Sequence, residues 1–205
     1  DCYGAKPRLL PLKAKWQFLI RKYLADGTAL AIPYFNNWYI CTTASPINQS
    51  TLTSIILEGT HSQPEQALMQ ELRKTLPDQM VMIDVGGNIG TFTSQFIDKC
   101  SDVYIFEPIP RLNKVIRDSI AYNQDKKIRL IEKAVGDVPG TVQMLDNNNS
   151  SVVNGQTDED ILHIQVTTLD QELAALPKID FIKIDVEGAE YDALCGALNT
   201  LKNMK

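Results

Sequence analysis

The stretch that decides the fold reads VMIDVGGNIGTF and runs from Val81 to Phe92. An apolar, β-prone run leads into a cluster of glycines, and a segment compatible with a helix follows. This order predicts a strand, a tight turn and a helix. Turns of this kind offer backbone N–H groups to a ligand at the edge of an α/β sheet. We therefore expect the residues after the strand to contact a small molecule.

The same alternation of strands and helices continues to the end of the chain. The predicted strands are VMIDVG (81–86), DVYIFEP (102–108), IRLIEKAVG (128–136) and IDFIKIDVEG (179–188), and the predicted helices are GTFTSQFIDKC (90–100), PRLNKVIRDSIAYN (110–123) and AEYDALCGALNTLK (189–202). Mostly apolar strands separated by helices predict an α/β fold with a doubly wound, mostly parallel sheet covered on both faces. An insertion at 137–177 is expected to form a β-hairpin from TVQML and ILHIQVTTL, joined by a polar loop.

Residues 1–77 show another pattern and are predicted to form an N-terminal extension of strands and helices. It is expected to pack on a domain formed by residues 78–205. We expect an amphipathic helix within residues 8–24 and a hairpin that turns at Asn36-Asn37. A second helix should begin near Pro64. Its apolar face is predicted to consist of Ala67, Leu68, Leu72 and Leu76.

The composition restricts the class of protein. The chain has 205 residues, of which 44% are hydrophobic, and a formal net charge of −5 without a polybasic tract. This balance disfavours nucleic acid as the main partner. The sequence contains no run of about 20 apolar residues, so it predicts no transmembrane segment. The cysteines are far apart, show no zinc-binding spacing and are expected to be free thiols of a cytoplasmic protein; they are Cys2, Cys41, Cys100 and Cys195.

Three ligands compete for the glycine turn. A phosphate-binding P-loop requires Gly-Lys-Ser/Thr, whereas Gly90-Thr91 carries no lysine. A nicotinamide site requires G-x-G-x-x-G, and the order from Gly86 to Gly90 does not have that spacing. Asp84 also precedes the turn, where its carboxylate would repel a pyrophosphate. S-adenosylmethionine fits better, since it has an ammonium, a sulfonium and a ribose diol but no phosphate.

Acidic residues are predicted to end three consecutive strands, as an adenosyl ligand would need. Asp84 can accept a hydrogen bond from the ammonium, directly or through water. Glu107, about 20 residues further on, can accept from both ribose hydroxyls. Asp137 follows the third predicted strand, where the adenine amino group is expected. Together the three acids predict an S-adenosylmethionine site more strongly than the glycine turn alone.

At these residues the sequence resembles the FkbM family of S-adenosylmethionine-dependent methyltransferases. The motifs are IDVGGNIGTFT, VYIFEPIP, KAVGD, VTTLD and FIKIDVEGAE, and they cover about residues 78–205. The resemblance implies a class I, Rossmann-like fold and methylation of hydroxyls on sugars or other small metabolites. On this chain it implies a cofactor site formed by Asp84, Gly86, Gly87, Asn88, Gly90, Thr91, Glu107, Pro108, Val135 and Asp137.

The catalytic side chains are expected at the end of the fourth strand, beside the cofactor. The cofactor brings the reactive methyl group, so the protein must align the acceptor and remove its proton. Asp185 and Glu187 can deprotonate an alcohol or hold a divalent cation, and the sequence leaves metal ligands unknown. Alternatively, Glu187 and Glu190 only complement the N-terminus of the next helix. His163 is expected on a strand face.

Other features are left open by the sequence. His61 receives no role, and the polar loop at residues 147–151 is either a lid or a solvated connection. The chain stops after the fourth strand and its helix, so FIKIDV is expected to be an exposed edge strand. That edge predicts an oligomer, a cover from the extension or, as we favour, a fragment of a longer protein. Two other functions stay possible, namely a cofactor-binding module without catalysis and a nicotinamide-dependent oxidoreductase.

Overall fold

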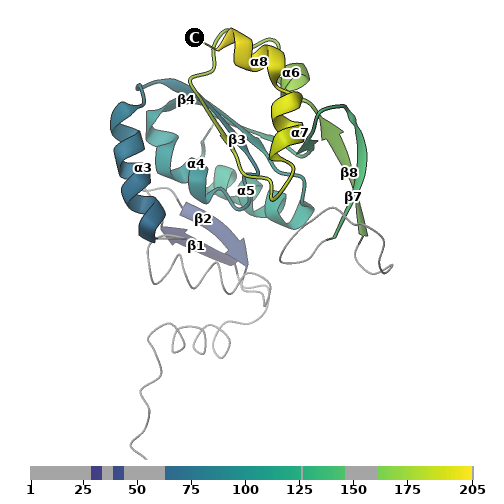
Figure 1. Cartoon of the computed structure of the whole chain (residues 1–205). Coiled ribbons are helices and arrows are strands. Elements are labelled where there is room, and N and C mark those ends of the chain that lie inside the picture. Colours follow the sequence, from purple (N-terminus) through teal and green to yellow (C-terminus); the bar gives the residue numbers. More distant parts are fainter. Residues whose placement is uncertain (1–28, 34–38, 44–62, 126, 146–160, 205) are drawn as a thin grey trace, which may run out of the picture.

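The computed structural model describes residues 29–33, 39–43, 63–125, 127–145 and 161–204 (Figure 1). The helix predicted within residues 8–24, the turn at Asn36-Asn37, His61 and the polar loop lie outside these residues, as does Cys2.

A four-stranded parallel sheet forms the centre of the structure. Its spatial order is β5-β4-β3-β9, and the strands are β3 (Met80–Val85), β4 (Cys100–Phe106), β5 (Ile128–Ile131) and β9 (Phe181–Ile184). All six residues of β3 are buried, as expected for an inner strand covered on both faces. The chain runs from β3 outward to β5 and returns to β9 on the other side of β3. The point where the strand order reverses therefore lies beyond the carboxyl end of β3.

Helices cover both faces of this sheet, so the predicted doubly wound arrangement is confirmed (Figure 1). Successive strand residues point to opposite faces. Met82 thus packs on one face with α3 (Gln63–Thr75), α4 (Thr91–Phe96) and α5 (Pro110–Asn123). Ile83 packs on the other face with residues of α6 (Leu169–Glu172) and α7 (Glu190–Cys195) and residues flanking α8 (Leu198–Asn203).

The N-terminal strands form the predicted hairpin. β1 (Ala29–Pro33) and β2 (Tyr39–Thr43) pair antiparallel, and β2 lies against α5. Ile40 is fully buried and belongs to the same apolar cluster as α4 and α5. The hairpin therefore contributes to the core of the sheet domain.

The apolar face predicted for α3 is wrong in part. Leu68 is 63% exposed and Ala67 is also exposed, whereas Met69, Leu72 and Leu76 pack on the core. These three residues follow the i, i+3, i+7 spacing of one helical stripe, and Leu68 lies about 70° around the helix axis from the middle of that stripe.

The third predicted strand, IRLIEKAVG, is divided between two sheets. Only β5 joins the central sheet, while β6 (Ala134–Val135) pairs parallel with β8 (Ile161–Thr167) in a second sheet. The charged residues Glu132 and Lys133 lie at the break, and Lys133 forms an ion pair of 2.7 Å with Glu172. The predicted hairpin of the insertion is confirmed, because β7 (Gly140–Leu145) pairs antiparallel with β8.

The last predicted helix is broken at Gly196 into α7 and α8. A Cβ atom on Gly196 would lie 2.0 Å from the carbonyl oxygen of Gly136, so only glycine fits there. The carbonyl oxygen of Gly196 accepts a bond of 2.9 Å from the N–H of Asp170. Two smaller differences concern the end of the helix predicted at residues 90–100. A 3₁₀ turn, η1 (Ile97–Lys99), follows α4, and Cys100 belongs to β4.

Candidate active site

The glycine turn after β3 is wedged between the ends of two other strands. The N–H groups of Gly86 and Gly87 both donate to the carbonyl oxygen of Phe106, at 2.9 and 3.1 Å. Gly86 has φ of 79°, and a Cβ atom there would lie 2.0 Å from the carbonyl oxygen of Asp185. The turn is thus fixed on β4 and packed against the end of β9. It lies where the strand order of the sheet reverses, the usual ligand site of such sheets.

Glu107 joins the end of β4 to the glycine turn. Its side chain is 5% exposed, and its two carboxylate oxygens accept from the N–H groups of Asn88 at 2.8 Å and Ile109 at 2.9 Å. Burial raises the pKa of Glu107 to about 7, although the two backbone bonds act in the opposite direction. The sequence prediction that this acid lies beside the turn is consistent with these contacts. A carboxylate has further lone pairs, so a hydroxyl ligand can still donate to it.

Asp84 lies beneath the turn rather than on its surface. Its side chain has no exposed area, and its Oδ2 atom accepts from the hydroxyl of Thr93 at 2.7 Å. The Oδ1 atom lies 3.2 Å from Nζ of Lys183, within ion-pair distance, but not in the direction of a hydrogen bond. In this structure both carboxylate oxygens thus face other protein groups.

Lys183 is a site residue that the sequence analysis missed. Its side chain is 15% exposed, and Nζ donates to the carbonyl oxygen of Gly86 at 2.7 Å. The same atom lies 3.8 Å from the carboxylate of Asp185. The sequence feature that could have indicated this role is the lysine inside the apolar strand FIKI, because a charged side chain in a covered strand requires a partner.

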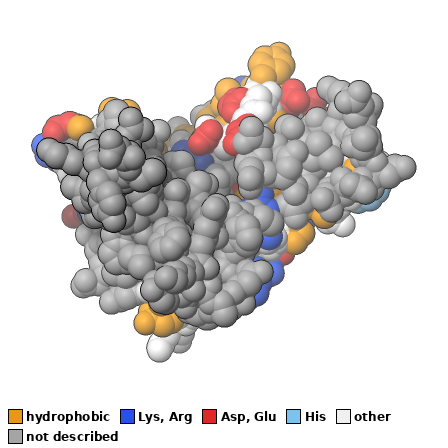
Figure 2. All heavy atoms as spheres, turned by 90° about the horizontal axis from the view of Figure 1, so that it is seen from below, with side chains coloured by type: hydrophobic (Ala, Val, Ile, Leu, Met, Phe, Trp, Pro, Cys, Tyr) orange, Lys and Arg blue, Asp and Glu red, His pale blue; other side chains and the backbone are white. Residues whose placement is uncertain are grey.

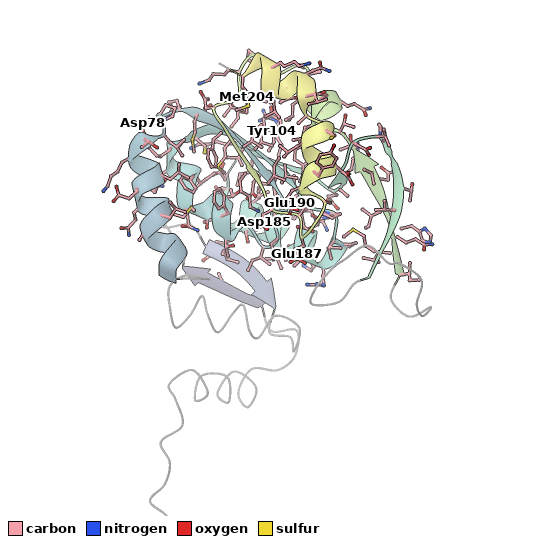
Figure 3. The ribbon with its side chains drawn as sticks, in the orientation of Figure 1. Asp78, Tyr104, Asp185, Glu187, Glu190 and Met204 are labelled. Carbon is pink, nitrogen blue, oxygen red and sulfur yellow. The ribbon has the colours of Figure 1, made fainter. Side chains whose placement is uncertain are left out.

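The turn between β9 and α7 carries three carboxylates, which Figure 3 labels together. The side chain of Asp185 is 72% exposed and Glu187 is exposed with φ of 51°, in the left-handed region that non-glycine residues seldom adopt. The carboxylate of Glu190 accepts from the N–H groups of Val186 at 3.1 Å and Gly188 at 3.0 Å. Hydrogen bonds from backbone N–H groups, first that of Glu190 itself and then those of Gly188 and Val186, lower the pKa of Glu190. Glu190 therefore holds the turn from the start of α7.

The remaining predicted site residues are spread more widely. Thr91 is the first residue of α4 and Pro108 directly follows Glu107; both are half-buried. Val135 is buried in β6. Asp137 is exposed and follows β6, so it ends a strand of the second sheet and not the third central strand. His163 is exposed on β8 opposite Gln143, as expected of a strand-face residue.

Of the acids described above, Asp185 and Glu187 are exposed, whereas Asp84 and Glu107 are buried. Figure 2, which looks from below the view of Figure 1, shows acidic side chains gathered in its upper middle part. Within the part of the chain that the structure describes, no group of three or more His, Cys, Asp or Glu side chains is placed to hold a metal ion. The metal alternative of the sequence analysis thus gains no support. Among the described cysteines, Cys100 and Cys195 are free thiols, and none of the described helices has the length and apolarity needed to cross a bilayer.

A family model described as "Methyltransferase FkbM domain" matches residues 84–205, more than half of the chain. No curated protein sequence matches.

Solved structures with a similar fold include three methyltransferases. Precorrin-6y C5,15-methyltransferase from Geobacter metallireducens has a TM-score of 0.44 and 15% identity over 71% of this chain and 58% of its own. An rRNA methylase from Streptococcus thermophilus has a TM-score of 0.33 and 16% identity over 37% of this chain and 45% of its own. Trm5b from Pyrococcus abyssi has a TM-score of 0.32 and 14% identity over 51% of this chain and 32% of its own. At these TM-scores none of the likenesses carries a conclusion about this chain.

Proposed function

The chain belongs to the FkbM methyltransferase domain family, and from this premise we propose an S-adenosylmethionine-dependent O-methyltransferase that acts on a hydroxyl of a sugar or another small metabolite. The class I, Rossmann-like fold is that of the structure described above, whereas the methyltransferase activity of the protein belongs to the proposal. Its cofactor, its acceptor and the role of each residue belong to the proposal as well. A cytoplasmic location and an oligomer formed through the β9 edge stay predictions from the sequence.

The carrying observation is the buried Glu107 carboxylate, hydrogen-bonded to the Asn88 N–H of the glycine turn. A ribose diol suits this site, because a carboxylate beside the glycine turn can accept hydrogen bonds from both hydroxyls. Glu107 would accept from the ribose hydroxyls, and the turn formed by Gly86, Gly87, Asn88 and Gly90 would hold the methionine end. Thr91 and Pro108 flank these contacts. Val135 and Asp137 would lie on the adenine side, which the second sheet contributes.

The chemistry requires one carboxylate near the acceptor hydroxyl. The bound cofactor would supply a methyl group on a sulfonium. Asp185 would orient the acceptor hydroxyl and take its proton. This role is supported by its exposed side chain, which follows β9, and by its carbonyl oxygen, which lies against Gly86. Glu187 would position the acceptor from the same turn, and its left-handed backbone fits a residue held in place for function.

A small hydroxylated acceptor is preferred over RNA for electrostatic reasons. The chain has a formal net charge of −5, and the proposed site includes the exposed acids Asp185 and Glu187. A phosphate backbone would be repelled there, since binding of nucleic acid depends on cationic side chains. A neutral or cationic acceptor meets no such repulsion.

The test is transfer of a radiolabelled methyl group from S-adenosylmethionine to a panel of hydroxylated metabolites, with an RNA arm. Wild-type protein should label an alcohol, and Asp185→Asn should lower the rate about 100-fold or more, as expected when a general base is lost. Asp192→Asn, which removes an exposed acid of α7, is the matched control. An unchanged rate in Asp185→Asn would remove Asp185 from the mechanism.

Binding measurements separate the two alternatives that the sequence left open. S-adenosylhomocysteine that binds without any methyl transfer would favour the cofactor-binding module. A chain that binds NAD but not S-adenosylhomocysteine in calorimetry would favour the oxidoreductase.

A further inference from the structure

We propose that Lys183 is a positioning residue for the cofactor site, whose ammonium fixes the glycine turn by binding the Gly86 carbonyl and the buried Asp84 carboxylate. The inference rests on the proposed function, because it concerns the turn that would hold the methionine end. Lys183 lies 97 residues beyond Gly86 and is not part of the glycine motif.

The ammonium donates to the carbonyl oxygens of Val85 and Gly86 and lies within ion-pair distance of the Asp84 carboxylate. Nζ lies 2.7 Å from the Gly86 oxygen, 3.3 Å from the Val85 oxygen and 3.2 Å from Oδ1 of Asp84. The strand register explains this placement, since Lys183 of β9 is the direct partner of Asp84 in β3. Lys183 therefore holds the turn through two hydrogen bonds and one ion pair.

The contact with Gly86 controls a single rigid unit of the turn. The carbonyl of Gly86 and the N–H of Gly87 belong to one planar peptide group. Lys183 binds the carbonyl end, and the N–H end donates to the Phe106 oxygen at 3.1 Å. The peptide plane is therefore held from β9 on one side and from β4 on the other. Its orientation decides where the following N–H groups of the turn point.

Asp84 acts through this arrangement instead of meeting the ligand directly. Its carboxylate is fully buried, and a buried carboxylate without a counter-charge is strongly unfavourable. Lys183 neutralises it, and the Thr93 hydroxyl satisfies its other oxygen. These three side chains come from β9, β3 and α4, which are the elements that surround the turn.

The test compares Lys183→Met with the double variant Asp84→Asn/Lys183→Met. Calorimetry with S-adenosylhomocysteine gives the affinity, and urea unfolding gives the stability. Lys183→Met should lower both, with at least a tenfold loss of affinity. The double variant should regain most of the stability, because no buried charge is left unpaired. It should still bind at least tenfold more weakly, because the Gly86 carbonyl has lost its donor.

Lys178→Met is the matched control, since this lysine is exposed and precedes β9. Its affinity should stay within twofold of wild type. A double variant that regains affinity together with stability would overturn the inference, because a lysine with only a structural role predicts that result. Wild-type protein that fails to bind S-adenosylhomocysteine would instead contradict the proposed function.

A second readout needs no ligand. The amide resonance of Gly87 in a ¹⁵N–¹H spectrum reports the orientation of the peptide that Lys183 binds. It should shift in the double variant and stay unchanged in Lys178→Met. An unshifted Gly87 resonance in the double variant would contradict the proposal, whichever ligand the protein binds.

Discussion

Glu107 combines two properties that oppose each other, namely deep burial and a carboxylate that two backbone N–H groups stabilise. Burial is the larger effect, so the pKa lies near 7 instead of 4.5. Burial brings the acid to the turn, and it disfavours the ionised carboxylate in the folded state. The free energy of unfolding should therefore depend on the ionisation of Glu107.

The sign of that effect gives a prediction. The folded-state pKa of Glu107 is raised above the unfolded value, so its contribution to stability is complete below about pH 4.5 and is lost as the pH rises to about 7. The difference corresponds to at most about 3 kcal/mol. Urea unfolding of wild type between pH 5 and pH 8 should show this loss, and Glu107→Gln should lack it. Glutamine has its own cost, because its amide faces an N–H donor, but that cost does not vary with pH. Parallel pH profiles of the two proteins would contradict the prediction.

The turn between β9 and α7 shows how one side chain can organise an element. Glu190 lies in the first turn of α7 and reaches back to the N–H groups of Val186 and Gly188. The sequence indicated an acid at a helix start, which complements the dipole. It gave no sign that the same carboxylate would fix the loop that presents Asp185 and Glu187.

Removal of this carboxylate should loosen the loop without unfolding the domain. In Glu190→Ala we expect amide hydrogen exchange at Val186 and Gly188 to become about tenfold faster, since each N–H loses its acceptor. Asp192→Ala removes an acid of the same helical turn and should leave both rates unchanged. Equal acceleration in the two variants would mean that the helix dipole, and not the hydrogen bonds, controls the loop.

The break between α7 and α8 gives another prediction at this scale. A Cβ atom at Gly196 would meet the backbone of Gly136, which has little room to move. We expect Gly196→Ala to destabilise the fold by about 1–3 kcal/mol, the usual range for overpacking. Gly140→Ala is the control, because nothing lies within 4 Å of its Cβ position. If Gly196→Ala were as stable as that control, the backbone segments around Gly136 and Gly196 would be able to move apart without cost, and the prediction would be wrong.

The elements that the sequence predicted correctly depend on local patterns. Residues 110–123 were predicted as a helix and form one, because Pro110 suits its first turn and the apolar spacing is helical. The split of IRLIEKAVG was not predictable in this way. Whether Ala134 and Val135 join the central sheet depends on their pairing with β8, about 30 residues further along the chain.

At the scale of the whole molecule, the site could also be predicted only where it depends on local sequence patterns. The glycine turn and Glu107 were predicted from strand ends, because parallel strands bring their carboxyl ends to one edge. The contact of Lys183 with Asp84 depends on the register between β3 and β9, which the sequence does not state. Which residues of β3 and β9 lie opposite each other is known only from the assembled sheet, so the role of Lys183 beside the turn was missed.

The relation between the N-terminal extension and the sheet domain is the last point at this scale. α3 belongs to residues 1–77, yet Leu72 packs on the core, and Arg73 and Asp98 form an ion pair of 2.7 Å. We therefore expect α3 to unfold together with the sheet. Leu72→Ala should lower the unfolding free energy by about 2 kcal/mol, the low end for buried leucine, because this side chain is half-buried. Leu68→Ala should change it by less than about 0.5 kcal/mol, since Leu68 is 63% exposed. Circular dichroism and amide hydrogen exchange of β3 should report the same urea midpoint in each protein. Two separate transitions, of which Leu72→Ala shifts only the first, would instead show that the extension folds on its own.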